Sequence, residues 1–123
     1  MVEKKDVILR ILGEGDNLIG ELEYKGVKLH PKIDAATVYM ATYNVTKAEQ
    51  ALNEYKKNKE NPILKLEAQK AGVLIFEGIM MLYPEDEYKK LMKMNLYLED
   101  FAVLIHSANN LSDMREKRHE GKN

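Results

Sequence analysis

The strongest constraint on the fold is a run of apolar residues that recur every three or four positions between Asp34 and Lys59. This spacing is that of one face of an α-helix, and the run predicts a helix of about 25 residues with a long, narrow apolar face. The residues of this face are Ala35, Val38, Ala41, Val45, Ala48, Leu52 and Tyr55. Asp34 suits the N-cap, and the Asn61-Pro62 pair ends the helix because a residue before proline avoids the α conformation.

A second helix is predicted from about Pro62 to Leu82. From Ala71 onward it is apolar almost all round, which is typical of a central, buried helix. We therefore expect the segment Ala71–Leu82 to be the most buried element of the fold. Its expected inner positions are Leu74, Ile75, Ile79 and Leu82.

A final helix is predicted to begin at Tyr83-Pro84, where a proline and the acidic residues after it suit the first turn of a helix. Its apolar face again has spacings of three and four. The residues of that face are Leu91, Met94, Leu98, Phe101, Ile105 and Ala108. Residues 113–123 have almost nothing to bury, so the sequence predicts a flexible tail there.

The N-terminal part of the chain alternates with a period of two, which predicts β-strands over Asp6–Leu12 and Asn17–Tyr24 and a short strand at Val27 to Leu29. Lys25-Gly26 predicts a tight turn between the last two strands, because glycine accepts a positive φ. Three short strands are only marginally stable alone, so one face of this meander must rest on helices.

The predicted fold class is therefore α+β, with a small N-terminal antiparallel β-meander followed by a three- to four-helix bundle. We expect one domain over residues 1–112, with the meander at about 5–30 and the helical part at about 34–112. No internal repeat or linker divides the sequence.

Charge and hydropathy narrow the classes of function. The chain has 19 basic and 20 acidic residues and a net charge of −1, whereas a nucleic-acid binder normally has a basic excess. The apolar stretch Ala71–Tyr83 has 13 residues and contains Glu77, so it is too short and too polar to span a bilayer. The N-terminus does not resemble a signal peptide. We expect a cytoplasmic protein that binds neither nucleic acid nor membrane.

The candidate chemical groups are sparse. The chain has no cysteine, and none of His30, His106 and His119 lies four residues from another histidine, as a helical metal pair would. Gly13-Glu14-Gly15 lacks the remaining residues of a phosphate-binding loop. Glu77 interrupts an apolar run, which leaves a functional buried carboxylate or a solvated or interface stripe with Glu67 and Lys70 as alternatives. The sequence predicts no catalytic residue, cofactor or metal, and therefore a protein that is not an enzyme.

The apolar helix faces remain open to two interpretations, a core within one chain or a contact with a second chain. Methionines, which adapt to irregular surfaces, add to the second interpretation. We expect a homo-oligomer that uses the first helix or the Leu91–Ala108 face. The candidate interaction surface consists of Val38, Ala41, Val45, Leu52, Tyr55, Leu91, Met94, Leu98 and Phe101.

A resemblance to a known family adds to this interpretation. The segments that carry it are Tyr24-Lys25-Gly26-Val27, Asp34-Ala35-Ala36, Phe76-Glu77, Tyr88-Lys89-Lys90-Leu91 and Asp100-Phe101. In this order, the chain resembles the tail assembly chaperones of long-tailed phages and prophages of Gram-positive bacteria. The resemblance implies a non-enzymatic helper in the host cytoplasm that binds tape-measure and tail-tube proteins.

A different class of function remains as the alternative. The chain could be a small-molecule or nucleotide-binding module, as in a phage or bacterial anti-defence or regulatory protein. Such a module would need arginine, lysine or aromatic side chains that converge on a pocket, and the place to expect one is between the meander and the helices.

Overall fold

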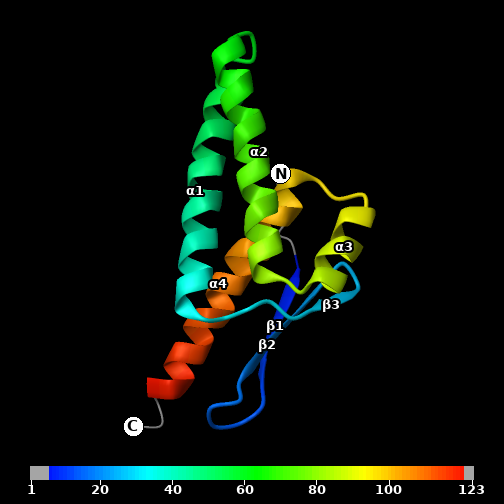
Figure 1. The fold of residues 1–123 in the computed structure, drawn as a ribbon, viewed down its shortest axis with the longest axis vertical. Helices are drawn as coiled ribbons and strands as arrows, with labels where there is room; N and C mark the ends of the chain where they lie inside the picture. Colours follow the sequence, from blue (N-terminus) through cyan, green and yellow to red (C-terminus); the bar gives the residue numbers. More distant parts are fainter. Residues whose placement is uncertain (1–5, 121–123) are drawn as a thin grey trace.

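The computed structural model describes residues 6–120 and consists of three strands followed by four helices (Figure 1). The strands are β1 (Val7–Leu12), β2 (Ile19–Tyr24) and β3 (Val27–Leu29), and they form one antiparallel sheet in the order β1-β2-β3. The helices are α1 (Ala35–Lys57), α2 (Pro62–Leu82), α3 (Glu85–Lys93) and α4 (Leu98–Glu120). This architecture confirms the predicted α+β fold. Residues 1–5 and 121–123 of the predicted domain and tail lie outside the described residues.

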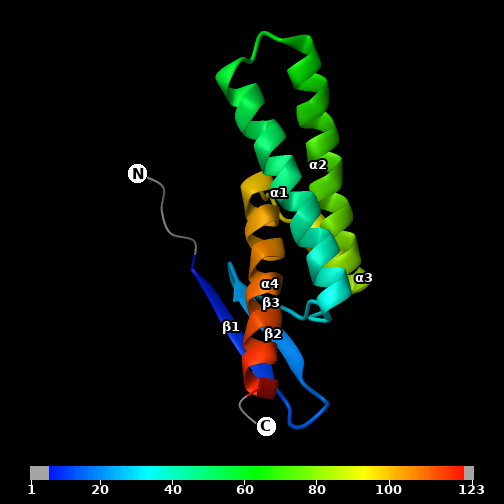
Figure 2. The same cartoon turned by 90° about the vertical axis from the view of Figure 1, so that its left-hand side faces the viewer.

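The two long helices α1 and α2 form an antiparallel hairpin whose tip points away from the sheet (Figures 1 and 2). α4 packs against the sheet strands β1 and β2 and also against α1 and α2, so it joins the two parts of the molecule. The upper half of the hairpin extends beyond α4 and the sheet (Figure 2). The start of α4 therefore lies beside the hairpin, below its tip, and we call this region of the molecule the shoulder.

Local sequence explains the sheet. On β2, Leu22 and Tyr24 are buried against the helices while Ile19 is exposed, as the predicted alternation requires. Lys25 and Gly26 both have positive φ, 50° and 79°, and they make the two-residue turn that joins β2 to β3. The predicted tight turn is confirmed.

The predicted helix boundaries of the hairpin also hold. The Asp34 carboxylate caps α1 by accepting hydrogen bonds from the Thr37 backbone N–H at 3.0 Å and the Thr37 hydroxyl at 2.7 Å. These bonds hold the pKa of Asp34 below its ordinary value. The Asn61 side chain caps α2 in the same way, accepting from the backbone N–H of Ile63 at 2.9 Å.

In the segment predicted to be the most buried, Ala71–Leu82, six of twelve residues are buried, whereas α4 has nine buried residues among 23. Ile75, Ile79 and Leu82 are buried, but Leu74 is only half-buried and Val73 is 55% exposed. The reason is that one face of α2 points outward along the whole helix, from Ile63 to Met80. α4, which lies against both the sheet and the hairpin, carries more buried residues than α2.

The predicted final helix is in fact two helices, α3 and α4, separated at residues 94–97. Met94 has an extended backbone, with φ −79° and ψ 146°, and ends α3. The Asp100 carboxylate then accepts a hydrogen bond from the Tyr97 backbone N–H at 2.9 Å, which caps the new helix from its third residue. Leu91 and Leu98 are therefore not on one helix face, although their spacing suggested it.

Residues 113–120, for which the sequence predicts a flexible tail, continue α4 to Glu120. Polar contacts take the place of burial there. The Arg115 guanidinium donates to the Ile33 carbonyl oxygen at 3.4 Å, and that of Arg118 donates to the Ile11 carbonyl oxygen at 3.2 Å. These contacts tie the end of α4 to the segment before α1 and to β1.

Candidate functional site

The structure divides the predicted interaction surface in two. Five of its residues have at most 5% of their surface exposed and pack inside the chain, so the prediction that they form an open surface is wrong. These five are Val38, Ala41, Val45, Leu91 and Phe101. The first three belong to the predicted apolar face of α1, which we call the α1 seam. This seam packs against α2 and α4 of the same chain. Of the two interpretations of this seam, the intramolecular core is the one that the fold realises.

The other four predicted residues, Leu52, Tyr55, Met94 and Leu98, are half-buried. Three of them come together at the shoulder of the molecule, where α4 begins beside the hairpin. Met94 lies in the connection between α3 and α4 and packs against the core instead. The shoulder is thus the place where the predicted apolar positions meet an accessible hollow.

Two adjoining hollows of about 500 and 290 Å³ lie at this shoulder, and Leu52 and Leu98 line both. We call them together the Leu98 groove. On one side of Leu98 the hollow is lined mainly by α1 and α2, and on the other side by α1 and α4. The apolar residues of the lining are Leu52, Tyr55, Ala68, Gly72, Val73, Ile75, Phe76, Leu98, Ala102 and Val103.

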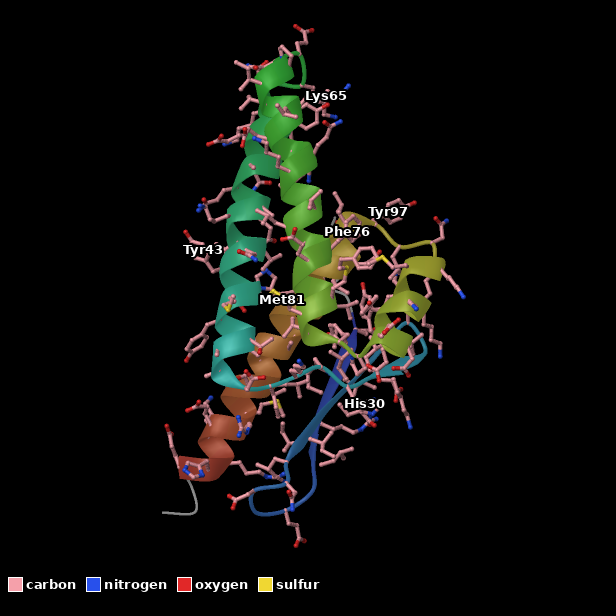
Figure 3. The ribbon with its side chains drawn as sticks, in the orientation of Figure 1. His30, Tyr43, Lys65, Phe76, Met81 and Tyr97 are labelled. Atoms are coloured by element: carbon pink, nitrogen blue, oxygen red, sulfur yellow. The ribbon has the colours of Figure 1, made fainter. Side chains whose placement is uncertain are left out.

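Polar side chains form the edge of the Leu98 groove. His106 on α4 and Glu49 on α1 meet there, with Nε2 and Oε1 2.8 Å apart. Lys56 of α1 and Lys65 of α2 line the groove nearer the tip of the hairpin, where Figure 3 labels Lys65. An apolar floor with a mixed polar edge is the usual anatomy of a protein-binding surface.

Aromatic packing supports the floor of the groove. Phe76 and Phe101 meet edge to face, with ring centroids 5.1 Å apart and planes at 74°. Figure 3 shows Phe76 on the side of α2 where α4 begins, near Tyr97. Because Phe101 is buried, this contact fixes Phe76 against α4 and gives the groove a preformed shape.

A buried carboxylate holds the start of α4, and with it Leu98, in place. Asp100 is 0% exposed, and its carboxylate accepts a hydrogen bond from the Tyr24 hydroxyl at 2.5 Å. The Lys25 ammonium lies 3.2 Å from the same carboxylate oxygen. The network therefore links the β2–β3 turn to the helix that carries Leu98. Burial and the Asp100 charge raise the pKa of Tyr24 well above its ordinary value.

Sequence reasoning missed this network, because its members are 76 residues apart and no local pattern joins them. The available signal was indirect. Asp100 lies two residues after Leu98, so once α4 is known to begin at Leu98 it occupies the third helical position, where an acidic side chain reaches back to cap the helix.

The histidines serve as contacts between elements. His30 at the end of β3 lies between two carboxylates, with Nδ1 2.8 Å from Glu87 Oε2 and Nε2 3.0 Å from Glu21 Oε2. These bonds, that with Glu87 first, raise the pKa of His30. His119 lies on the exposed last turn of α4. Glu77 is exposed, as the interpretation of a solvated stripe required.

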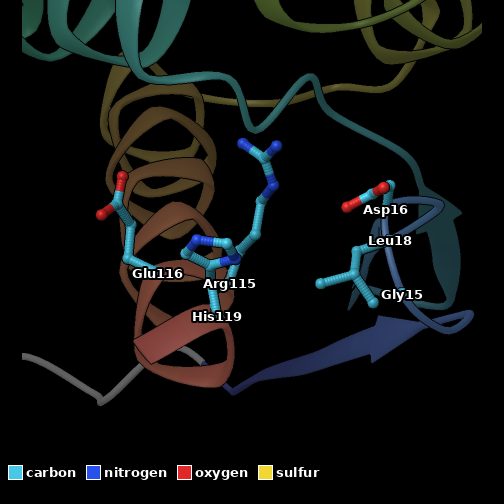
Figure 4. Close-up of a pocket in the computed structure, with 6 residues that line it drawn as sticks. All are labelled: Gly15, Asp16, Leu18, Arg115, Glu116 and His119. Carbon is cyan, nitrogen blue, oxygen red and sulfur yellow. The ribbon is translucent and has the colours of Figure 1, made fainter. Parts of the chain in front are cut away.

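A second hollow, of about 240 Å³, lies between the β1–β2 loop and the last turns of α4 (Figure 4). Together with another hollow, lined by β1 and the end of α4, it lies between the meander and the helices, where the sequence predicts a small-molecule or nucleotide site. Arg115 and His119 line it from α4, but Asp16 and Glu116 line it as well. The two carboxylates offset the positive charge that phosphate groups would need.

Within residues 6–120, no three His, Asp or Glu side chains have the arrangement of a metal site. In the same part of the chain, no helix has the length and the apolar character to cross a membrane.

The chain was also compared with known proteins. Protein-family models, curated proteins and solved structures were each compared with this chain, and none of the three comparisons found a match.

Proposed function

We propose that the protein is a non-enzymatic assembly factor that holds an apolar segment of a partner protein in the Leu98 groove. The observation that carries this proposal is the groove itself, with its apolar floor between two long helices and its polar edge. A helix lays its apolar face into a groove of this kind with anchors every three or four residues. Charged residues along the edge, such as Lys56 and Glu49 of α1, then set the direction of the bound segment.

The more specific form of the proposal follows the resemblance of the sequence to phage tail assembly chaperones. In that role the bound segment belongs to a tape-measure protein, a long chain that needs its apolar stretches covered before assembly. The groove suits such a task because it is open and runs across several helices, so it can accept successive apolar segments. The proposal also includes tail-tube proteins as further partners and the host cytoplasm as the location of the protein.

The test is capture of partners from phage-infected or prophage-induced cells, with the tagged full chain as bait and mass spectrometry as the readout. The proposal expects tape-measure and tail-tube proteins in the bound fraction. The variants Leu98→Gln and Tyr55→Lys each place a polar group in the groove and should reduce the captured tape-measure protein about tenfold, as expected for the loss of one central apolar anchor.

Leu12→Gln is the matched control, because Leu12 is an exposed leucine on β1, far from the groove. It should bind like the unchanged protein. Far-UV circular dichroism and urea unfolding establish that each variant is folded. Folded groove variants that capture the same proteins in the same amount would show that the groove is not the binding site, and a bound fraction without tail proteins would reject the chaperone role.

A further inference from the structure

The outer face of α2 carries a stripe of six exposed residues, of which only Val73 also lines the Leu98 groove. Its members are spaced by three, four, three, four and three residues, so they lie on one side of the helix. We call it the α2 stripe, and it consists of Ile63, Leu66, Lys70, Val73, Glu77 and Met80. At 1.5 Å per residue it is roughly 25 Å long.

The four apolar residues of the α2 stripe are among the most exposed large apolar side chains in the described part of the chain. Ile63 is 70% exposed, Leu66 52%, Val73 55% and Met80 50%. The opposite side of α2 faces α1 and α4, with Ile75 and Ile79 buried there. Four large apolar side chains aligned at the surface of one helix are unusual for a face that stays in water, and they indicate contact with another molecule.

The order of residues along the α2 stripe indicates which kind of molecule would make this contact. Leu66 and Met80 each lie seven residues from Val73, on opposite sides of it. Lys70 lies three residues before Val73, and Glu77 lies four residues after it. When the helix is reversed about Val73, Leu66 therefore meets Met80, and Lys70 meets Glu77 to within about 1.5 Å along the axis.

We propose that a second copy of this chain docks on the α2 stripe, antiparallel, with a two-fold axis at Val73. Each dimer then has two Lys70–Glu77 contacts, two Leu66–Met80 contacts and a central contact between the two Val73 side chains. This is the isologous arrangement of most homodimers, in which one patch is complementary to itself. In the single chain Lys70 is 3.5 Å from Glu67, and Glu77 makes no ion pair within residues 6–120.

This interface differs from the faces first expected to form an oligomer, the α1 seam and Leu91–Ala108. The residues that would have to make those contacts, such as Val38, Ala41, Leu91 and Ile105, are buried within the chain. The dimer axis at Val73 lies at the border of the Leu98 groove, but neither Lys70 nor Glu77 lines the groove. Changes to these two charges therefore test self-association without altering the lining of the groove.

A charge-reversal experiment tests the proposal by sedimentation equilibrium of the full chain over a range of micromolar concentrations. The unchanged protein should approach twice its chain mass of 14.2 kDa as its concentration rises. Lys70→Glu and Glu77→Lys each turn both cross-dimer pairs from attractive to repulsive, so each should raise the dissociation constant about tenfold or more.

Two further samples make the test specific for the antiparallel geometry. The double variant Lys70→Glu with Glu77→Lys restores both pairs in reverse and should regain the dimer. An equimolar mixture of the two single variants should form a heterodimer, since one chain then presents two glutamates and the other two lysines. Both effects should weaken with added salt.

Lys89→Glu is the matched control. Lys89 is also exposed, its ammonium lies 2.5 Å from the Glu85 carboxylate on its own helix α3, and the substitution changes the net charge equally. It should dimerise like the unchanged protein. A chain that stays monomeric throughout the concentration range would overturn the proposal. So would a dimer that neither single reversal weakens, or one that the double variant fails to restore.

Discussion

The Tyr24 hydroxyl donates a 2.5 Å hydrogen bond to the Asp100 carboxylate, and both residues are buried. One residue ends β2 and the other lies in the first turn of α4, so this bond fixes the sheet against the helix that carries Leu98. Asp100 also caps α4 through the Tyr97 backbone N–H. A charged acceptor inside the protein makes such a bond stronger than one between neutral groups, but also more costly to remove.

The first prediction compares two buried tyrosines. Tyr24→Phe removes a hydrogen bond to a buried charge and should lower the free energy of unfolding by about 2–3 kcal/mol. Tyr83→Phe is the matched control, because the Tyr83 hydroxyl donates at 2.8 Å to the neutral carbonyl oxygen of Leu104 and should cost only about 1 kcal/mol. Urea unfolding of the three proteins measures both values. Equal losses would mean that the Asp100 charge does not strengthen the bond.

The second prediction concerns alkaline pH. The pKa values of Tyr24 and Tyr83 are raised above the ordinary value of 10, for both residues chiefly by burial. The unfolded chain therefore loses these two protons near pH 10, while the folded protein keeps them. The contribution of each tyrosine to stability is complete below pH 10 and is lost as the pH rises further, at about 1.4 kcal/mol per pH unit for each tyrosine.

Urea unfolding at a series of pH values between about 9 and 11 tests this slope. Tyr24→Phe lacks one of the two groups, so its stability should fall less steeply with pH than that of the unchanged protein. Parallel curves for the two proteins would contradict the assigned shift of the Tyr24 pKa.

The sequence was sufficient to predict the helices and strands of this fold, but not which neighbours each of them packs against. Periodicity, the Asp34 cap and the break at Asn61-Pro62 located α1 and α2, since these signals act within a few residues of their own position. The α1 seam could not reveal its partner, because Val38 and Ala41 have the same pattern whether they meet α2 or a second chain. The break between α3 and α4 was hidden because Leu91, Met94 and Leu98 keep a helical spacing across it.

In the candidate site, too, some features could be predicted from the sequence and others could not. Leu52, Tyr55 and Leu98 were identified from their helical spacing, and the structure brings them together at one groove. Nothing in the spacing separated them from Val38 and Phe101, which are buried, because a periodic pattern marks a face without giving its depth. The Tyr24–Asp100 bond joins positions 76 residues apart, and only the folded chain brings these together.

The third prediction concerns the histidine between Glu21 and Glu87. Hydrogen bonds raise the pKa of His30 above 6.5, so its contribution to stability is complete below pH 6.5 and is lost as the pH rises through the higher folded value. The bond from His30 lowers the pKa of Glu21 below 4.5, so that contribution is present above pH 4.5 and is lost as the pH falls through the lower folded value. The contacts of His30 should therefore stabilise the fold most between these two values.

The urea midpoint of the unchanged protein should fall as the pH rises above 6.5 and His30 loses its proton. His30→Gln keeps a polar side chain but does not titrate, so its midpoint should change less over that range. His119→Gln is the control on the exposed end of α4, and it should keep the pH profile of the unchanged protein. A profile that His30→Gln leaves unaltered would show that other groups cause the change.

The last prediction uses two glycines of α2 that differ in what surrounds them. A methyl group added at Gly72 would meet only Leu98 side-chain atoms at 3.9 Å or more, which is ordinary contact. Gly72→Ala should therefore raise the free energy of unfolding by about 0.5–1 kcal/mol, since alanine favours the helix. At Gly78 the added carbon would lie 2.9 Å from Ile105 Cδ1, whose side chain is fully buried and has little room to move.

Gly78→Ala gains the same helix propensity but must push Ile105 aside at the junction of α2 and α4, and overpacking of this kind costs about 1–3 kcal/mol. The two substitutions are chemically identical and lie on one helix, so their difference isolates the packing at Gly78. We expect Gly72→Ala to be more stable than Gly78→Ala by at least about 1 kcal/mol in urea unfolding. Equal stabilities would mean that α4 can shift away from α2, and that the floor of the Leu98 groove is less rigid than its contacts indicate.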